Sequence, residues 1–314
     1  MFACLQITKE ARPLWPLGPQ RPLWPLGPQP RLLGRRRAAP PALVRVEPPG
    51  GAPFFRLEAA QRGKGELPWA EIERAAGRLR TRMLFPEGVC PPPPPPPRSA
   101  SGAQLEPGLR AFAPRRLPLL LCLRTAQQIL QKTEAPARQL RVTVVDSRGV
   151  LARQLEFLVP LAGSLRVFTP EPAIYRAAAA QLQRRYGVTL VVSDSPACFA
   201  QSHLVVADDL RLFTGRESGL ILTPDTETPL PGGAACRVAR GRGPLLPEAH
   251  APLCPPGIDP LLFACALYEL CGVKEMERLR FPHFRLDGAG EDYSIEQLAG
   301  MVDNICMSTQ LHLR

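Results

Sequence analysis

The back half of the chain alternates short apolar runs with stretches whose apolar residues recur at helical spacing. Five runs rich in Val, Leu and Ile have the length and composition of strands that are buried on both faces. They are "RVTVVD" (141–146), "SLRVFT" (164–169), "VTLVVSD" (188–194), "HLVVAD" (203–208) and "GLILTPD" (219–225). The alternation predicts an α/β fold over residues 136–228, with a parallel sheet covered by helices on both faces.

Amphipathic helices are predicted between these strands. After the first strand, one face is formed by Leu151, Leu155, Leu158 and Ala162. After the second strand, Pro172 opens a helix that Gly187 ends, as proline and glycine commonly do. Its inward face is formed by Tyr175, Ala179, Leu182 and Tyr186.

The pattern of residues 229–314 predicts a loop-rich C-terminal segment whose helices pack back on the sheet or on the front domain. A helix is expected at 259–271, and a last one at 294–303. The last helix begins with Ser294 and has Gln297 three residues later, which is the spacing of a capping box.

Residues 42–135 predict a small α+β domain. "ALVRVE" and "PFFRLE" alternate as strands do, and "PPGGAP" between them is typical of a turn. A helix is expected from Pro68, with one face formed by Ile72, Ala75, Ala76, Leu79 and Met83. A Pro-rich loop at 91–97 and a second helix at about 117–132 complete this domain.

Residues 1–41 are interpreted as a disordered, basic, Pro-rich tail. The nonapeptide "RPLWPLGPQ" occurs twice, at 12–20 and 21–29, which is too few copies for a solenoid. Such proline density favours extended polyproline II structure. A chain that starts near residue 41 is therefore expected to fold with unchanged stability. Whether residues 1–41 are a genuine translated segment stays open.

The net charge of +11 changes this picture little. Residues 1–140 hold 22 Lys/Arg against 9 Asp/Glu, and 35 of the 39 cations are Arg. GC-rich coding explains this better than a nucleic-acid surface, because no basic stripe interleaved with aromatics follows residue 40. Nine scattered cysteines without a CxxC pair indicate reduced thiols and a cytoplasmic protein. No apolar run approaches the ~20 residues that span a bilayer, so no membrane partner is expected.

The strand and helix spacing at 141–225, with "SDSPACFAQSHLVVADD", resembles the NAD(P)-binding Rossmann domain of two-domain dehydrogenases such as shikimate dehydrogenase and glutamyl-tRNA reductase. The resemblance implies a Rossmann-like sheet and an NAD(P) cofactor. Its glycine loop is degenerate, however: the three glycines of G-x-G-x-x-G fall on Asp146, Arg148 and Leu151. A carboxylate at the first position would repel phosphates, and side chains at the other two would block their approach.

The residues that would line such a cofactor site lie at the predicted strand ends. Gly149 supplies one flexible point beside Ser147, and Arg148 is placed to neutralise a phosphate. The second strand ends in Thr169 where a dehydrogenase has an acidic residue for the ribose. Aspartates end the remaining strands at Asp194, Asp208 and Asp225, on the same edge as Asp146. Aspartate is also a common N-cap and turn residue, which accounts for most of these positions.

A second resemblance is carried by "DSRGVL" at 146–151, which is similar to the D-x-D-G-T-L signature of haloacid-dehalogenase-type phosphatases. It implies a nucleophilic aspartate at Asp146 and Mg²⁺ held by carboxylates. Arg148 stands at the second aspartate of that signature, Val150 stands at the threonine, and no lysine occurs between 133 and 273. Phosphoryl transfer relies on such positive charge, so only a remnant of this family is indicated.

No metal site is expected, because the cysteines and histidines of the last third lack zinc-ligand spacing. They are His250, Cys254, Cys265, Cys271 and His283. The favoured function is a non-catalytic module that senses a ligand or binds a partner, the ligand being a nucleotide or another small molecule. The alternative is an NAD(P)-dependent oxidoreductase with an atypical phosphate loop. Catalytic residues, substrate and oligomeric state stay open.

Overall fold

The computed structural model describes residues 1–9, 41–61, 66–79, 82–92, 109–199, 201–213, 219–224, 228 and 237–311. The chain forms two compact units. Unit 1 comprises Met1–Phe112 with Leu253–Asp259, and unit 2 comprises Ala113–Pro252 with Pro260–Arg314. The predicted α/β class is confirmed.

Unit 1 contains a five-stranded sheet in the order β2-β3-β1-β4-β5. Its elements are β1 (Phe2–Lys9), β2 (Ala42–Val46), β3 (Phe54–Gln61), α1 (Trp69–Leu79), β4 (Arg82–Leu84) and β5 (Arg110–Ala111). β1 is parallel to both β3 and β4, and β2 pairs with β3 in antiparallel fashion. The two strands predicted from "ALVRVE" and "PFFRLE" are therefore confirmed.

The expectation of a disordered tail is wrong for residues 2–9, because they form the central strand of this sheet. Phe2, Ala3, Cys4 and Leu5 are completely buried, and the Phe2 ring stacks on Phe54 at 4.8 Å. A short apolar segment gains strand structure here because it has hydrogen-bonding partners on both sides. Residues 10–40, with both nonapeptides, lie outside the described residues.

Met83 is also placed differently from the prediction. α1 ends at Leu79, and Met83 lies in β4, paired with Ala3 of β1. Met83 is buried, as predicted, but it is buried as part of the sheet and not on the face of a helix. A single apolar residue after a helix fits both the helical period and the strand period, so the pattern alone does not show whether the helix continues or a strand begins.

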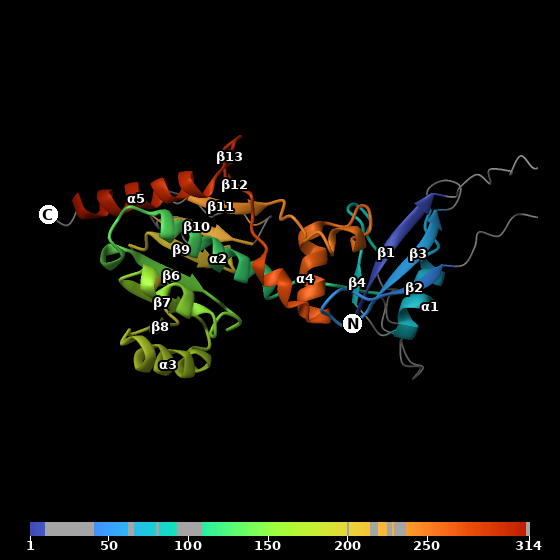
Figure 1. The fold of residues 1–314 in the computed structure, drawn as a ribbon, viewed down its shortest axis with the longest axis horizontal. Coiled ribbons are helices and arrows are strands. Elements are labelled where there is room, and N and C mark those ends of the chain that lie inside the picture. Colours follow the sequence, from blue (N-terminus) through green and yellow to red (C-terminus); the bar gives the residue numbers. More distant parts are fainter. Residues whose placement is uncertain are drawn as a thin grey trace, which may run out of the picture. The chain divides into compact units, whose positions relative to one another are not determined.

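Unit 2 contains an eight-stranded sheet in the order β13-β12-β11-β10-β9-β6-β7-β8 (Figure 1). The strands are β6 (Arg141–Val145), β7 (Ser164–Phe168), β8 (Val191–Ser193), β9 (Leu204–Ala207), β10 (Leu220–Thr223), β11 (Arg237–Arg242), β12 (His283–Leu286) and β13 (Asp292–Tyr293). β6 to β11 are mutually parallel, and β12 and β13 add antiparallel strands. Counted from β6, the parallel strands have the 3-2-1-4-5-6 order of the doubly wound nucleotide-binding fold.

Both faces of the central strands are buried. On one face, Val145, Val205 and Ile221 pack with Phe199 of η5 (Pro196–Phe199) and Leu210 of η6 (Leu210–Leu212). Successive strand residues point to opposite faces, so the buried residues between them face the other way. There α2 (Leu117–Lys132) packs on β9 and β10. The sequence assigned α2 to the front domain, but it packs within unit 2.

The connection from β6 to β7 differs from the predicted helix. It consists of turns and two short 3-10 helices, η2 (Leu155–Phe157) and η3 (Val159–Leu161). Leu151, Leu155 and Leu158 are buried as expected. The prediction of which residues face inward is therefore confirmed, and the prediction of an α-helix is wrong. Pro160 has no N–H to donate, which disfavours a continuous α-helix at this point.

The other helices of unit 2 agree better with the sequence. α3 (Arg176–Tyr186) follows η4 (Pro172–Tyr175) and ends at Gly187, whose φ is +68°. Tyr186 is exposed, however, and does not face the core. α4 (Pro260–Cys271) is confirmed. α5 (Ile295–Leu311) has the predicted capping box, with Ser294 and Gln297 exchanging hydrogen bonds of 2.8 and 3.3 Å, but extends past the expected end at 303.

Candidate functional site

The candidate site lies where the order of the parallel strands reverses. β6 has β7 on one side and β9 on the other, and the chain winds away from β6 in both directions. The connections that follow β6 and β9 therefore separate at the carboxyl edge of the sheet. Ligands of open α/β sheets bind in the crevice that such a separation creates.

Asp146 directly follows β6 and is completely buried. Its Oδ1 accepts hydrogen bonds from the backbone N–H groups of Arg148 (3.3 Å) and Val150 (3.1 Å), and its Oδ2 accepts one from Leu151 (2.7 Å). The carboxylate thus binds the N–H groups that a glycine-rich loop would direct at a phosphate. Aspartate commonly caps the N–H groups that follow a strand, and Asp146 does so here.

Tyr175 completes the surroundings of this carboxylate. Its hydroxyl donates to Asp146 Oδ2 at 2.5 Å, from the end of η4, and its side chain is completely buried. Burial raises the pKa of Tyr175 far above its usual range, and the charge and hydrogen bond of Asp146 raise it further. The phenol therefore stays protonated and acts as a fixed hydrogen-bond donor.

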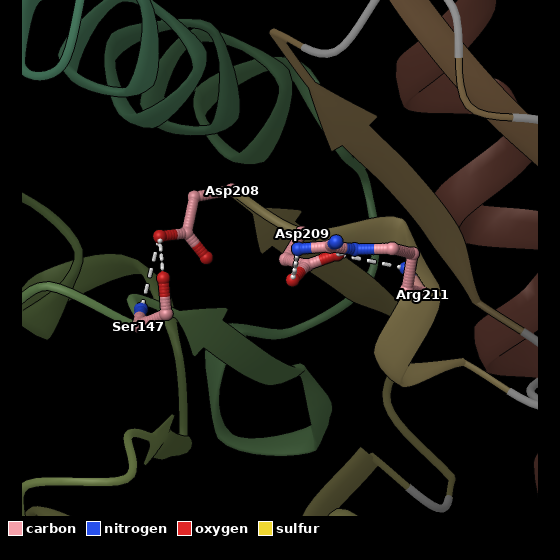
Figure 2. A network of polar contacts seen from close by, with 4 residues as sticks. All are labelled: Ser147, Asp208, Asp209 and Arg211. Atoms are coloured by element: carbon pink, nitrogen blue, oxygen red, sulfur yellow. Dashed lines mark hydrogen bonds and ion pairs between the residues drawn. The ribbon is translucent and has the colours of Figure 1, made fainter. Parts of the chain in front are cut away.

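Ser147 and Asp208 join the ends of β6 and β9. Asp208 Oδ2 accepts hydrogen bonds from the Ser147 backbone N–H (3.0 Å) and hydroxyl (2.5 Å), as Figure 2 shows. Burial raises the pKa of Asp208; the Ser147 hydroxyl bond opposes this, and the charge of Asp146 adds to it. Asp208 Oδ1 is buried and has no hydrogen-bond partner. The crevice between the two strands is bridged by this contact.

The same view shows an ion pair beside Asp208. Asp209 accepts from Arg211 Nε (2.9 Å) and Nη2 (2.8 Å), and its Oδ1 also accepts from the Arg211 backbone N–H. This carboxylate therefore caps η6. Of the two consecutive aspartates, Asp208 faces Ser147 and Asp209 serves the local turn.

Arg148 and Gly149 form the tip of the loop. Gly149 has φ of +68°, and a Cβ there would lie 2.6 Å from Ile174 Cγ2. Glycine is favoured at this position by its backbone angle, and a larger residue would also have to displace the Ile174 side chain. The Arg148 side chain is exposed, and its charge opposes the rise in the pKa of Asp208.

Two other predicted residues lie apart from this cluster. Thr169 is buried after β7, where its hydroxyl accepts from the Glu171 N–H at 3.3 Å and forms a local turn. Asp194 is exposed after β8, two strands from β6. Asp225 lies outside the described residues. The structure thus brings together Asp146, Ser147 and Asp208, and the sequence did not assign Tyr175 to this site.

A pocket of about 630 Å³ opens beside the loop. It is lined by Gly149, Val150, Arg153 and Arg116, with Ile174 and residues of α3 on the other side. The Arg116 Nε is buried without a hydrogen-bond partner. A polar ligand is therefore geometrically possible here, next to the loop rather than on its N–H groups.

The cluster lacks the parts of an activated nucleophile. Ser147 donates to a carboxylate without an imidazole between them, and His203 precedes β9 and so lies at the opposite edge of the sheet. Asp146 has hydrogen bonds to both oxygens and no exposure to solvent. The N–H groups of the loop already donate to the Asp146 carboxylate.

Fold and site together define an α/β protein with the strand order of nucleotide-binding domains and a buried carboxylate that binds the N–H groups of the loop after β6. The sequence matches no protein-family model and no curated protein. Among solved structures, it is similar to Δ1-pyrroline-2-carboxylate reductase of Thermococcus litoralis, determined with NADH and L-proline. The identity is 14%, the match covers 33% of this chain and 36% of the reductase, and the TM-score is 0.25. This chain therefore spans about a third of that protein's length.

Within the described residues, no helix is long and apolar enough to cross a membrane. The same part of the chain contains no disulfide.

Proposed function

We propose that this protein is a non-catalytic module that senses a ligand or binds a partner, built on a Rossmann-like sheet that no longer binds a dinucleotide at its phosphate loop. The observation that supports this is the hydrogen bonding of Asp146 to the N–H groups of Arg148, Val150 and Leu151. Anion sites at such loops depend on those donors being available.

Electrostatics favours the carboxylate over an incoming phosphate. A pyrophosphate reaches these donors only if Asp146 leaves them, and it then faces a carboxylate of the same charge. Removing the partners of a buried charge costs about 3–5 kcal/mol. At about 1.4 kcal/mol per factor of ten, that penalty lowers dinucleotide affinity by a factor on the order of 10² to 10⁴.

Thermal shift with NAD⁺, NADP⁺ and NADPH tests the proposal. We expect the Tm of the protein to stay constant as each dinucleotide is raised to millimolar concentration, since a ligand stabilises only what it binds. A Tm that rises with dinucleotide concentration would contradict the proposal, unless the dinucleotide binds at another place on the protein.

The second candidate is an NAD(P)-dependent oxidoreductase with an atypical loop. The pocket that contains Arg116 and Arg153 favours it, because those two cations lie beside the loop that would face a cofactor. If the protein is instead a non-catalytic module, its ligand would be a nucleotide or another small molecule that binds in this same pocket. The absence of disulfides from the described residues supports a reducing, cytoplasmic location.

A further inference from the structure

A second hollow of unit 2 shares no residue with the β6–β9 cluster. It is a groove of about 880 Å³ between the second half of α2, residues 277–282 and the start of α5. Four cations line it: Arg124, Lys132, Arg278 and Arg280. Two carboxylates, Glu277 and Glu296, line it as well. The groove therefore has an excess of positive charge.

Neither carboxylate forms an ion pair with one of the three arginines. Glu296 is bound to Lys132 at 2.7 Å, and Glu277 accepts the Tyr268 hydroxyl at 2.6 Å. Among the described residues, no ion pair is formed by Arg124, Arg278 or Arg280.

Neutral groups hold two of these guanidinium groups in place. Arg124 lies 3.6 Å above the Phe157 ring and donates to Gln127 Oε1 at 3.1 Å. The hydrogen-bond network orients the Gln128 amide oxygen toward Arg280, where it accepts from Nε (2.9 Å) and Nη1 (3.1 Å). Burial lowers the pKa of Arg124, Glu277 opposes that effect, and the like charge of Arg280 adds to it. Arg124 and Arg280 are thus held in place with like charges close enough to interact, and neither forms an ion pair with a carboxylate.

We propose that this groove binds a small molecule that carries two or more phosphate groups. A guanidinium fork pairs with phosphate through two parallel hydrogen bonds, and three forks in one groove exceed what a single phosphate can engage. The volume lies within the range of ordinary small-molecule sites. Gln127 and Gln131 also line the groove. This inference goes beyond the proposed function and does not depend on it.

Isothermal titration of the full chain with sodium tripolyphosphate at constant ionic strength tests the groove. We expect saturable binding that weakens at least tenfold in the double variant Arg278→Gln/Arg280→Gln. Both side chains are exposed, so the Tm of the variant should match the parent. Arg176→Gln is the matched control, because Arg176 is an exposed arginine at the start of α3 that does not line the groove. Its binding should be unchanged.

Three results would overturn the inference: no saturable binding, equal weakening in Arg176→Gln, or sulfate binding as tightly as tripolyphosphate. Dinucleotides also contain a pyrophosphate, so their titrations are repeated in the double variant. A Tm rise that persists there does not come from the groove and contradicts the proposed function. A rise that disappears there belongs to the groove and supports this inference.

Discussion

At the scale of single residues, Asp146 combines a structural role with the exclusion of a ligand. Replacing it with glycine removes four hydrogen bonds and leaves the Tyr175 hydroxyl buried without its partner. We expect Asp146→Gly to lower the free energy of unfolding by about 2–4 kcal/mol, measured by urea denaturation. The vacated N–H groups should then bind phosphate, so NAD⁺ should raise the Tm of this variant more than that of the parent.

Tyr175→Phe is the control for that variant. It removes one donor but leaves the backbone N–H groups bound to Asp146. It should be destabilised by about 1 kcal/mol and should gain no response to NAD⁺. An equal response in both variants would mean that loosening of the protein, and not the opened loop, explains the binding.

The sequence predicted part of this site. The sequence placed Asp146 at the first glycine position, at the end of a buried strand, and identified aspartate as a common cap and turn residue there. Tyr175 could not be assigned in the same way, because its periodicity showed only that it faces inward. A buried tyrosine needs a partner for its hydroxyl, and that requirement is the signal that could have linked it to a carboxylate.

At the scale of elements, α2 depends on a carboxylate from another helix. α2 has no side-chain cap of its own, and Glu269 of α4 accepts from the N–H groups of Arg115, Arg116 and Leu117. The interaction resembles an N-cap and is also favoured by the helix dipole. We expect Glu269→Ala to reduce the free energy of unfolding by about 1–2 kcal/mol, as measured by urea denaturation.

Glu296→Ala provides the comparison, because Glu296 is an exposed partner of Lys132. Ion pairs on the surface contribute little, so this variant should unfold at the same urea concentration as the parent. If both substitutions had the same effect, the capping role of Glu269 would be refuted.

Helices and strands were predictable where their buried apolar residues recur in the sequence at regular spacing. β6, β7, β9 and β10 are short apolar runs, and each was found close to its predicted position. β11 was missed because its buried face includes Arg240, which is 8% exposed and forms a two-pronged ion pair with Asp287 at 2.8 and 2.9 Å. A charged residue whose partner is 47 positions away gives no local signal of burial.

At the scale of the whole molecule, unit 1 depends on β1. A chain that begins at residue 41 lacks the strand that pairs with both β3 and β4. Burying Phe2 and Leu5 alone contributes about 3–6 kcal/mol, which is comparable to the total stability of many domains. We now expect the shortened chain to lose the cooperative unfolding transition of unit 1, in contrast to the expectation from the sequence.

Deleting residues 12–29 is the informative control, since it removes both nonapeptides and keeps β1. The entropy of closing a connection changes slowly with its length, so this variant should retain the transition. Circular dichroism during urea titration would compare the two. Unfolding of unit 1 in both variants would show that the repeats themselves stabilise the sheet.

Unit 1 is built from two segments that lie far apart in the sequence, and this has a consequence for protein synthesis. β1 is made before its neighbours β3 and β4, and the segment Leu253–Asp259 of the same unit is made far later; Gly257 O accepts the Glu87 N–H at 2.8 Å. At about 5–20 residues per second, a ribosome needs roughly 12–49 s to proceed from the end of β1 to that segment. During this interval the apolar β1 has emerged while its unit is incomplete, and binding by chaperones would protect it until translation supplies the rest.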